Sequence, residues 1–125
     1  MTDADRELLQ RADAVAARAY APYSQFFVGA AVRTWDGRVF EGVNVENAAY
    51  PLGICAEKAA LGKAVSEGVS PGDVEVLAVT ASPCGGCRQW FHEFRIDHVV
   101  YRRANGEVAV MTPAELLPDT FDLEP

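Results

Sequence analysis

Three cysteines and one glutamate are the residues of this chain whose types and spacing could carry out chemistry. Cys55 stands two residues before Glu57, and Cys84 and Cys87 form a C-x-x-C pair directly after Pro83. A lone C-x-x-C pair is compatible with a redox centre, a zinc site or chance. Both cysteine groups stand where a helix is expected to begin, and a helix N-terminus favours the thiolate form that binds metals.

Three thiolates leave one position of a tetrahedral zinc ion without a protein ligand. An open fourth position is typical of catalytic zinc, whereas structural zinc is usually held by four protein ligands. Water at the open position has its pKa lowered from about 15.7 to about 7, which supplies hydroxide near neutral pH. Glu57 is close enough to reach this water without binding the metal, and it can pass the proton to a substrate nitrogen. This combination is the signature of zinc-dependent base deaminases in its three-cysteine version.

The elements that must position these residues follow from hydrophobic periodicity and turn signals. Helices are expected at residues 3–20, 55–67, about 85–94 and from Thr112 onward. Strands are expected at residues 27–34, 38–46, 74–81, 97–103 and 107–111. The run at 74–81 is nearly all apolar, as a strand covered on both faces should be.

The resulting order, α, β, β, α, β, α, β, β, α, predicts a three-layer α/β domain with one central sheet. The path from strand 38–46 through helix 55–67 to strand 74–81 suits a right-handed parallel crossover. Residues 1–125 are enough for one such domain and too few for two.

Composition excludes several classes of protein. Eighteen acidic residues against eleven basic ones give a net charge of −7, which argues against nucleic acid as the main partner, because phosphate binding needs a basic surface. No apolar run approaches the roughly 18 residues of a membrane span, and the polar, acidic start is unlike a secretory signal. Three cysteines cannot all pair with one another, so thiolates or core thiols in a reducing cytoplasm are expected.

Beyond the metal motifs, the chain resembles the small cytidine deaminases over nearly its whole length. The motifs that carry the resemblance are, in chain order, Tyr20-Ala21-Pro22-Tyr23-Ser24, Val28-Gly29-Ala30-Ala31, Asn44-Val45-Glu46-Asn47-Ala48-Ala49-Tyr50-Pro51, Cys55-Ala56-Glu57, Ser82-Pro83-Cys84-Gly85-Gly86-Cys87-Arg88-Gln89 and Glu115-Leu116-Leu117-Pro118. Several independent motifs in the right order are far more specific than any single one.

The resemblance implies a three-layer α/β/α cytidine deaminase-like fold with one mixed five-stranded sheet. It implies zinc-dependent hydrolysis of cytidine and 2′-deoxycytidine to the uridines and ammonia, a reaction of pyrimidine salvage. It also implies one Zn²⁺ per chain, a nucleoside substrate, no nucleic-acid or membrane partner, and a cytoplasmic homotetramer whose active sites lie near subunit contacts.

Transferred residue by residue, the resemblance makes Cys55, Cys84 and Cys87 the zinc ligands and Glu57 the catalytic proton shuttle. Most family members have an arginine after this glutamate, where it donates hydrogen bonds to the ligand sulfurs and offsets their negative charge. This chain has Lys58 there, which keeps the charge but loses the planar guanidinium group.

The resemblance also implies substrate contacts. Phe26 would pack on the pyrimidine ring, while Asn44 and Glu46 would hydrogen-bond the ribose hydroxyls. The main chain at Ala56 and around Ser82-Pro83 would bind the carbonyl and amino groups of the base.

Two aromatic residues, Tyr50 and Phe121, would lie near the substrate of a neighbouring subunit. The connection before Ser82 departs from the family, because Val79-Thr80-Ala81 runs almost straight into the second cysteine motif. Relatives usually have several more residues at this point, so substrate range and assembly are the properties that this departure affects.

Two other functions are compatible with parts of the pattern. The first is the same chemistry on another aminated nucleoside, base or nucleoside antibiotic, as in blasticidin-type deaminases; Asn44 and Glu46 favour an ordinary ribose instead. The second is a thiol redox centre or a non-catalytic zinc module, which needs neither Cys55 nor Glu57. Structural or surface positions are expected for the remaining candidates, Trp35, Trp90, His92 and His98.

Overall fold

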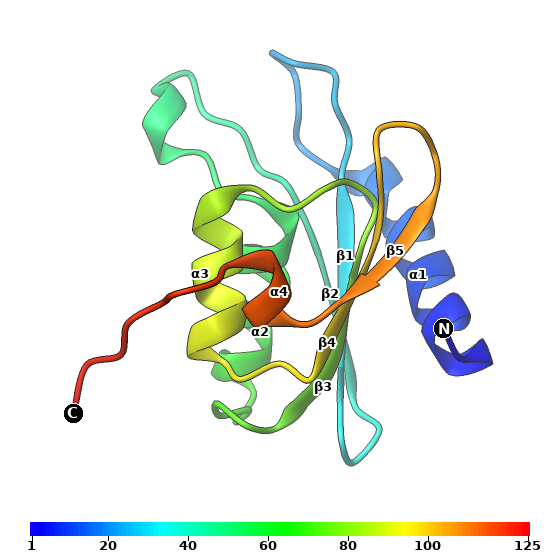
Figure 1. Cartoon of the computed structure of the whole chain (residues 1–125). Coiled ribbons are helices and arrows are strands. Elements are labelled where there is room, and N and C mark those ends of the chain that lie inside the picture. Colours follow the sequence, from blue (N-terminus) through cyan, green and yellow to red (C-terminus); the bar gives the residue numbers. More distant parts are fainter.

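A mixed five-stranded sheet occupies the centre of the structure, and helices cover both of its faces (Figure 1). The computed structural model describes residues 1–125. Across the sheet the strand order is β2-β1-β3-β4-β5. The strands are β1 (Gly29–Thr34), β2 (Val39–Val43), β3 (Val74–Val79), β4 (His98–Arg102) and β5 (Val108–Met111).

The helices form two layers on opposite faces of the sheet. Helix α1 lies on one face, and α2, α3 and α4 lie on the other (Figure 1). Their bounds are α1 (Asp3–Val15), α2 (Ala56–Ser66), α3 (Gly85–Glu93) and α4 (Pro113–Leu116), with 3-10 turns η1 (Ala16–Arg18) and η2 (Tyr50–Leu52). This arrangement confirms the predicted three-layer α/β/α fold with one mixed sheet. None of these helices is long and apolar enough to span a membrane.

The predicted order of elements is confirmed, but the opening helix is shorter than the predicted 3–20. The α-helix stops at Val15 and continues only as the 3-10 turn η1. Ala19 is no longer helical, and the Tyr20 N–H instead donates to the Asn44 carbonyl at 3.1 Å, beside an isolated bridge between Tyr20 and Val45. A tertiary contact with the segment after β2 therefore replaces the last helical turn.

The predicted parallel crossover from β2 through α2 to β3 is confirmed in strand direction, and it passes over one intervening strand. The two strands point the same way, but β1 lies between them and is antiparallel to both. The parallel neighbours are β3 and β4, which α3 connects. Because the β1–β2 hairpin uses only one edge of β1, the other edge is free to pair with β3, and β2 stays at the edge of the sheet.

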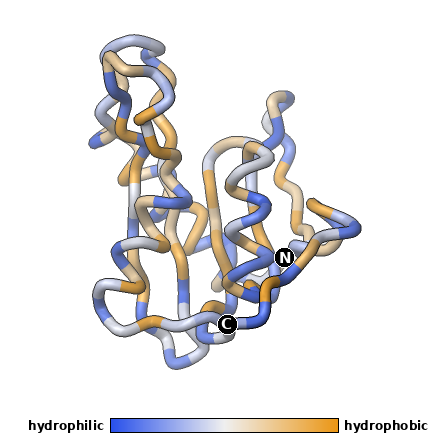
Figure 2. The backbone as a smooth tube through the Cα atoms, turned by 90° about the vertical axis from the view of Figure 1, so that its left-hand side faces the viewer, coloured by the Kyte–Doolittle hydropathy of each residue, from blue (hydrophilic) through white to orange (hydrophobic).

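Alternate residues of the central strands face the two helical layers, as the pleat of a strand requires. In β1, Ala30 and Val32 belong to the larger core cluster with α2 and α3, whereas Ala31 packs in the smaller cluster with α1. In β3, Leu77 belongs to the larger cluster and Val76 to the smaller one. This confirms the prediction that the strand is covered on both faces. Along the backbone as a whole, hydrophobic stretches are interrupted by hydrophilic ones (Figure 2).

Gly42 allows α2 to approach the sheet closely. A Cβ at this position would lie 2.3 Å from the Ala60 nitrogen and 2.7 Å from the Ala56 oxygen, both in the backbone of α2. The start of the helix thus packs directly against the backbone of β2. Since Cys55 is the residue that precedes the first turn of α2, this contact also fixes where Cys55 lies.

We expect Gly42→Ala to lower the free energy of unfolding by about 1–3 kcal/mol, because its methyl group must displace the backbone of α2. The matched control is Gly62→Ala in the middle of α2, where a Cβ meets nothing within 4 Å. This control should raise the stability by about 0.5–1 kcal/mol, the usual helix preference for alanine. Urea unfolding measures both values, and equal stabilities of the two variants would contradict the close packing.

Candidate active site

The three cysteine side chains converge where α2 and α3 begin. Cys55 directly precedes α2, Cys84 directly precedes α3, and Cys87 lies in the first turn of α3. Their sulfurs all lie within 4.8 Å of one another, and those of Cys55 and Cys84 are 3.7 Å apart. The Cys87 N–H donates to the Cys84 sulfur at 3.4 Å, so this helix start already stabilises negative charge on a ligand atom.

This arrangement of sulfurs fits a tetrahedral zinc ion. Zn–S bonds of about 2.3 Å at tetrahedral angles place two ligand sulfurs about 3.8 Å apart, close to the separation of the Cys55 and Cys84 sulfurs. Neither histidine joins the cluster: His92 pairs with Asp122, and His98 pairs with Asp5 and with its neighbour in sequence, Asp97. The donor set is therefore three sulfurs, which leaves one position of the metal for a solvent oxygen or substrate.

The surroundings favour the thiolate form of Cys55. The pKa of Cys55 is lowered to about 6, and a hydrogen bond with Cys87 is the largest cause. A hydrogen bond with Cys84 and the positive charge of Lys58 lower this pKa further, whereas burial of the thiol raises it. The pKa of Cys87 is raised, because this buried thiol is the partner that keeps its proton. A bound cation removes this competition, since a metal-coordinating thiol is deprotonated.

Glu57 lies buried next to the sulfurs, with only 4% of its surface exposed. Burial raises its pKa to about 7, and the nearby charge of Cys55 acts in the same direction. A carboxyl group whose pKa lies near the working pH can both accept and release a proton, which is what a general acid–base residue must do.

A cavity of about 520 Å³ opens over these groups, within the range of about 300–1,000 Å³ that is usual for small-molecule sites. The residues assigned from the sequence that line it are Phe26, Asn44, Glu46, Tyr50, Cys55, Ala56, Glu57, Ser82 and Cys84. They come from segments 23–28, 44–57 and 81–84, which loop out beyond the sheet or start a helix (Figure 1). None of the lining residues is basic.

Comparisons with known proteins agree with this site. The family model described as "Cytidine and deoxycytidylate deaminase zinc-binding region" matches residues 2–103. The chain is 45% identical over 130 residues to a cytidine deaminase of Halalkalibacterium halodurans, covering 96% of each protein. It is 40% identical over 134 residues to that of Mycobacterium tuberculosis, covering 99% of this chain and 95% of the relative. A crystal structure of cytidine deaminase from Burkholderia pseudomallei is similar with a TM-score of 0.87 and 44% identity, covering 97% of this chain and all of the other.

The chain belongs to the cytidine and deoxycytidylate deaminase family. The matched residues include all three cysteines and Glu57, so the family's zinc-binding region coincides with the sulfur cluster. The cofactor is therefore zinc, and the protein is a zinc-dependent hydrolase. This confirms the resemblance that the sequence motifs indicate.

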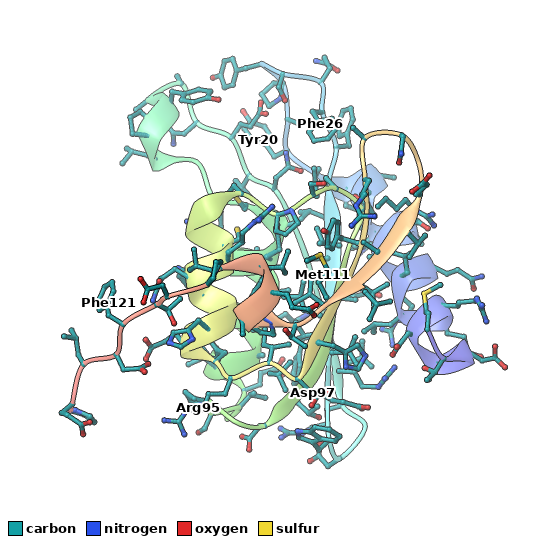
Figure 3. All side chains as sticks on the ribbon, viewed as in Figure 1. Tyr20, Phe26, Arg95, Asp97, Met111 and Phe121 are labelled. Atoms are coloured by element: carbon teal, nitrogen blue, oxygen red, sulfur yellow. The ribbon has the colours of Figure 1, made fainter.

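Three residues singled out in the sequence do not line the cavity: Cys87, which is buried beside the other two cysteines, Lys58 and Phe121. Phe121 is on the C-terminal tail, far from Phe26 (Figure 3), and is 67% exposed. Lys58 places its ammonium nitrogen 6.0 Å from the centre of the Trp90 ring and beside Gly86. The cation thus faces an aromatic ring instead of hydrogen-bonding a sulfur, and Trp90, expected only as a structural residue, is its partner.

The two ribose candidates have main-chain partners that the sequence analysis missed. Asn44 accepts from the Val28 N–H and donates to the Phe26 carbonyl, both at 2.9 Å. Glu46 accepts from the N–H groups of Tyr23 and Ser24, at 3.0 and 3.1 Å. The alternate positions of Asn44 and Glu46 near the end of a strand predict that both side chains lie on one polar face. No local pattern predicts that Glu46 accepts hydrogen bonds from residues more than twenty positions earlier in the sequence.

We expect the purified protein to bind one zinc ion per chain through three sulfurs and one oxygen. X-ray absorption at the zinc edge should show about three sulfur scatterers near 2.3 Å. Cys87→Ser should lower zinc occupancy, because a buried hydroxyl is a poorer ligand than a thiolate. A fourth sulfur, or a nitrogen from His92 or His98, would contradict the open fourth position.

Proposed function

We propose that this chain hydrolyses cytidine and 2′-deoxycytidine to uridine and 2′-deoxyuridine, with release of ammonia, as a step of pyrimidine salvage. The observation that carries the proposal is the position of a buried carboxyl group, Glu57, beside a three-sulfur zinc site at the base of a nucleoside-sized cavity. The proposal is supported by relatives that are 40–45% identical over nearly the whole chain and are named cytidine deaminases.

The chemistry divides between the cofactor and the protein. Zinc held by Cys55, Cys84 and Cys87 supplies a Lewis acid that makes water acidic enough to lose a proton near neutral pH. In the overall reaction a C–O bond forms at C4 of the base and the C4–N bond to the amino group breaks. One proton of the water ends on N3 of the product and the other on the departing ammonia. Glu57 is the residue beside the site that can accept and deliver both protons.

The charges in the cavity favour a nucleoside over a nucleotide. Two carboxylates, Glu46 and Glu57, line it, and no lysine, arginine or histidine does. A 5′-phosphate is usually bound by such cations, and the whole chain carries a net charge of −7. We therefore assign this chain to cytidine rather than to deoxycytidylate, although the family contains both activities by its description.

The proposal is tested by ammonia release from cytidine, 2′-deoxycytidine, cytosine, 5-methylcytidine, adenosine, guanine, deoxycytidylate and blasticidin S. Glu57→Gln should keep zinc and fold but lose about 10²–10⁴-fold in turnover, because an amide cannot shuttle protons. The matched control is Glu67→Gln at the exposed end of α2, which should retain full activity. Turnover of blasticidin S or another compound without turnover of cytidine would refute the assignment, and so would a Glu57→Gln variant within tenfold of the wild type.

We also propose that residues 1–125 form one catalytic domain that works in the cytoplasm as a homotetramer. Free thiols at all three cysteines suit a reducing compartment. Large apolar side chains are exposed on the two segments that carry cavity residues, among them Phe27, Tyr50 and Leu52. Surfaces of this kind are usually covered by another protein molecule, and the exposed rings of Tyr50 and Phe121 are free to reach a neighbour's substrate.

Light scattering at micromolar concentration should therefore give a mass about four times that of the chain, as closed symmetric assemblies are the usual oligomers. Tyr50→Ser should weaken the assembly, the substrate affinity, or both, while Trp35→Ser, which replaces another exposed aromatic residue, on the β1–β2 turn, serves as the control. A fully active monomer would contradict the assembly.

A further inference from the structure

The segment that carries Phe26 has no regular secondary structure of its own. Residues 21–28 connect the bridge at Tyr20 to β1 and project at the same end of the sheet as the 44–54 segment (Figure 1). Phe26 lines the cavity but is 61% exposed, so packing alone does not fix its ring. The preceding residue, Gln25, has φ of 60°, a left-handed conformation that costs a non-glycine residue free energy. Some other interaction must hold this segment.

Both main-chain polar groups of Phe26 are bound by side chains. Its N–H donates to the Ser24 hydroxyl oxygen at 3.0 Å, and its carbonyl accepts from the Asn44 side-chain amide at 2.9 Å. The other end of the Asn44 amide accepts from the Val28 N–H. Phe26 is therefore held from both sides by polar side chains, in place of the strand partners that a regular element would provide.

The Ser24 hydroxyl is the link between Phe26 and the Glu46 carboxylate. A charged carboxylate can only accept hydrogen bonds and a hydroxyl has a single proton to donate, so Ser24 donates to Glu46 and turns its lone pairs toward the Phe26 N–H. The hydroxyl of Ser24, with further bonds from the N–H groups of Ser24 and Tyr23, holds the pKa of Glu46 below its ordinary value despite some opposing desolvation. Glu46 is consequently charged at neutral pH and keeps the hydroxyl in this orientation.

We propose that Ser24 is a positioning residue for deamination. Its hydroxyl links the Glu46 carboxylate to the Phe26 main chain through two hydrogen bonds, a connection called the relay below. The relay fixes the aromatic wall against which the base packs. This inference rests on the proposed function, because it concerns the wall of that substrate cavity. It gives Glu46 a task besides any bond to the sugar. Replacing Glu46 removes both tasks together, whereas replacing Ser24 interrupts the relay alone.

The contact itself is tested by hydrogen–deuterium exchange of the zinc-loaded protein, without reference to activity. In Ser24→Ala, amides in the 21–28 segment should exchange at least about tenfold faster, the loss expected for a hydrogen-bond network anchored on a charged group. Exchange in α2 should not change. Ser24→Thr keeps the hydroxyl and should restore slow exchange. The matched control, Ser66→Ala, removes an exposed serine hydroxyl that bonds the Gly62 carbonyl in α2 and should leave residues 21–28 unaffected. Unchanged exchange of these residues in Ser24→Ala would overturn the proposal.

The effect on the reaction is tested by a double-mutant cycle with Phe26→Ala. Ser24→Ala should raise KM for cytidine about three- to tenfold with kcat within about twofold, the pattern of a lost binding wall. If Ser24 acts through the Phe26 ring, Ser24→Ala should change KM by less than about twofold in the Phe26→Ala background. An equal rise of KM in both backgrounds would mean that Ser24 contacts the substrate independently, and an unchanged KM would mean that the relay positions nothing; either result overturns the proposal. A wild-type protein that fails to deaminate cytidine would refute the proposed function instead, and the exchange experiment would still decide on the relay.

Discussion

Two helix N-termini must meet within a few ångströms if three sulfurs from distant parts of the chain are to bind one metal ion. Cys55 and Cys84 are 29 residues apart in sequence, yet their sulfurs lie 3.7 Å apart. The sheet makes this possible, because α2 and α3 cover the same face and begin at the same end (Figure 1). Because Gly42 has no side chain, the backbone of α2 can pack directly against β2. The metal site therefore depends on the packing of two helices on one sheet face, and the same helix starts contribute Cys55, Glu57 and Cys84 to the lining of the cavity.

The same packing buries Glu57, and the burial has opposite effects on stability and chemistry. A carboxyl group taken out of water favours its neutral form, so keeping it charged there costs free energy that the rest of the core must offset. In return its pKa rises to about 7, where proton uptake and release are both easy. The charge of Lys58 lies close by but is turned toward the Trp90 ring, which leaves the cavity itself without a cation.

The cavity has a rigid base and a wall built from loops. Its base, at Cys55, Ala56 and Glu57, belongs to a helix start that is buried in the main core. Its wall, which includes Phe26, is held by the side chains of neighbouring segments and not by sheet hydrogen bonds. Such a division places the reacting groups on a packed helix start and the substrate wall on loops, as functional sites carried by a rigid scaffold commonly do.

The sequence by itself determined the order of the elements and singled out the three cysteines and the glutamate that the structure brings together. Those signals are local: Cys55 with Glu57, and Cys84 with Cys87, stand two and three residues apart at helix starts, so spacing along one helix is enough to relate them. Pairings between distant segments were decided only by the tertiary structure. The position of β1 between β2 and β3 depends on which strand edge is free, and the bond of Ser24 to a carboxylate 22 residues away depends on which loops project together. Periodicity and turn signals describe how a chain behaves within an element, and packing alone selects which elements become neighbours.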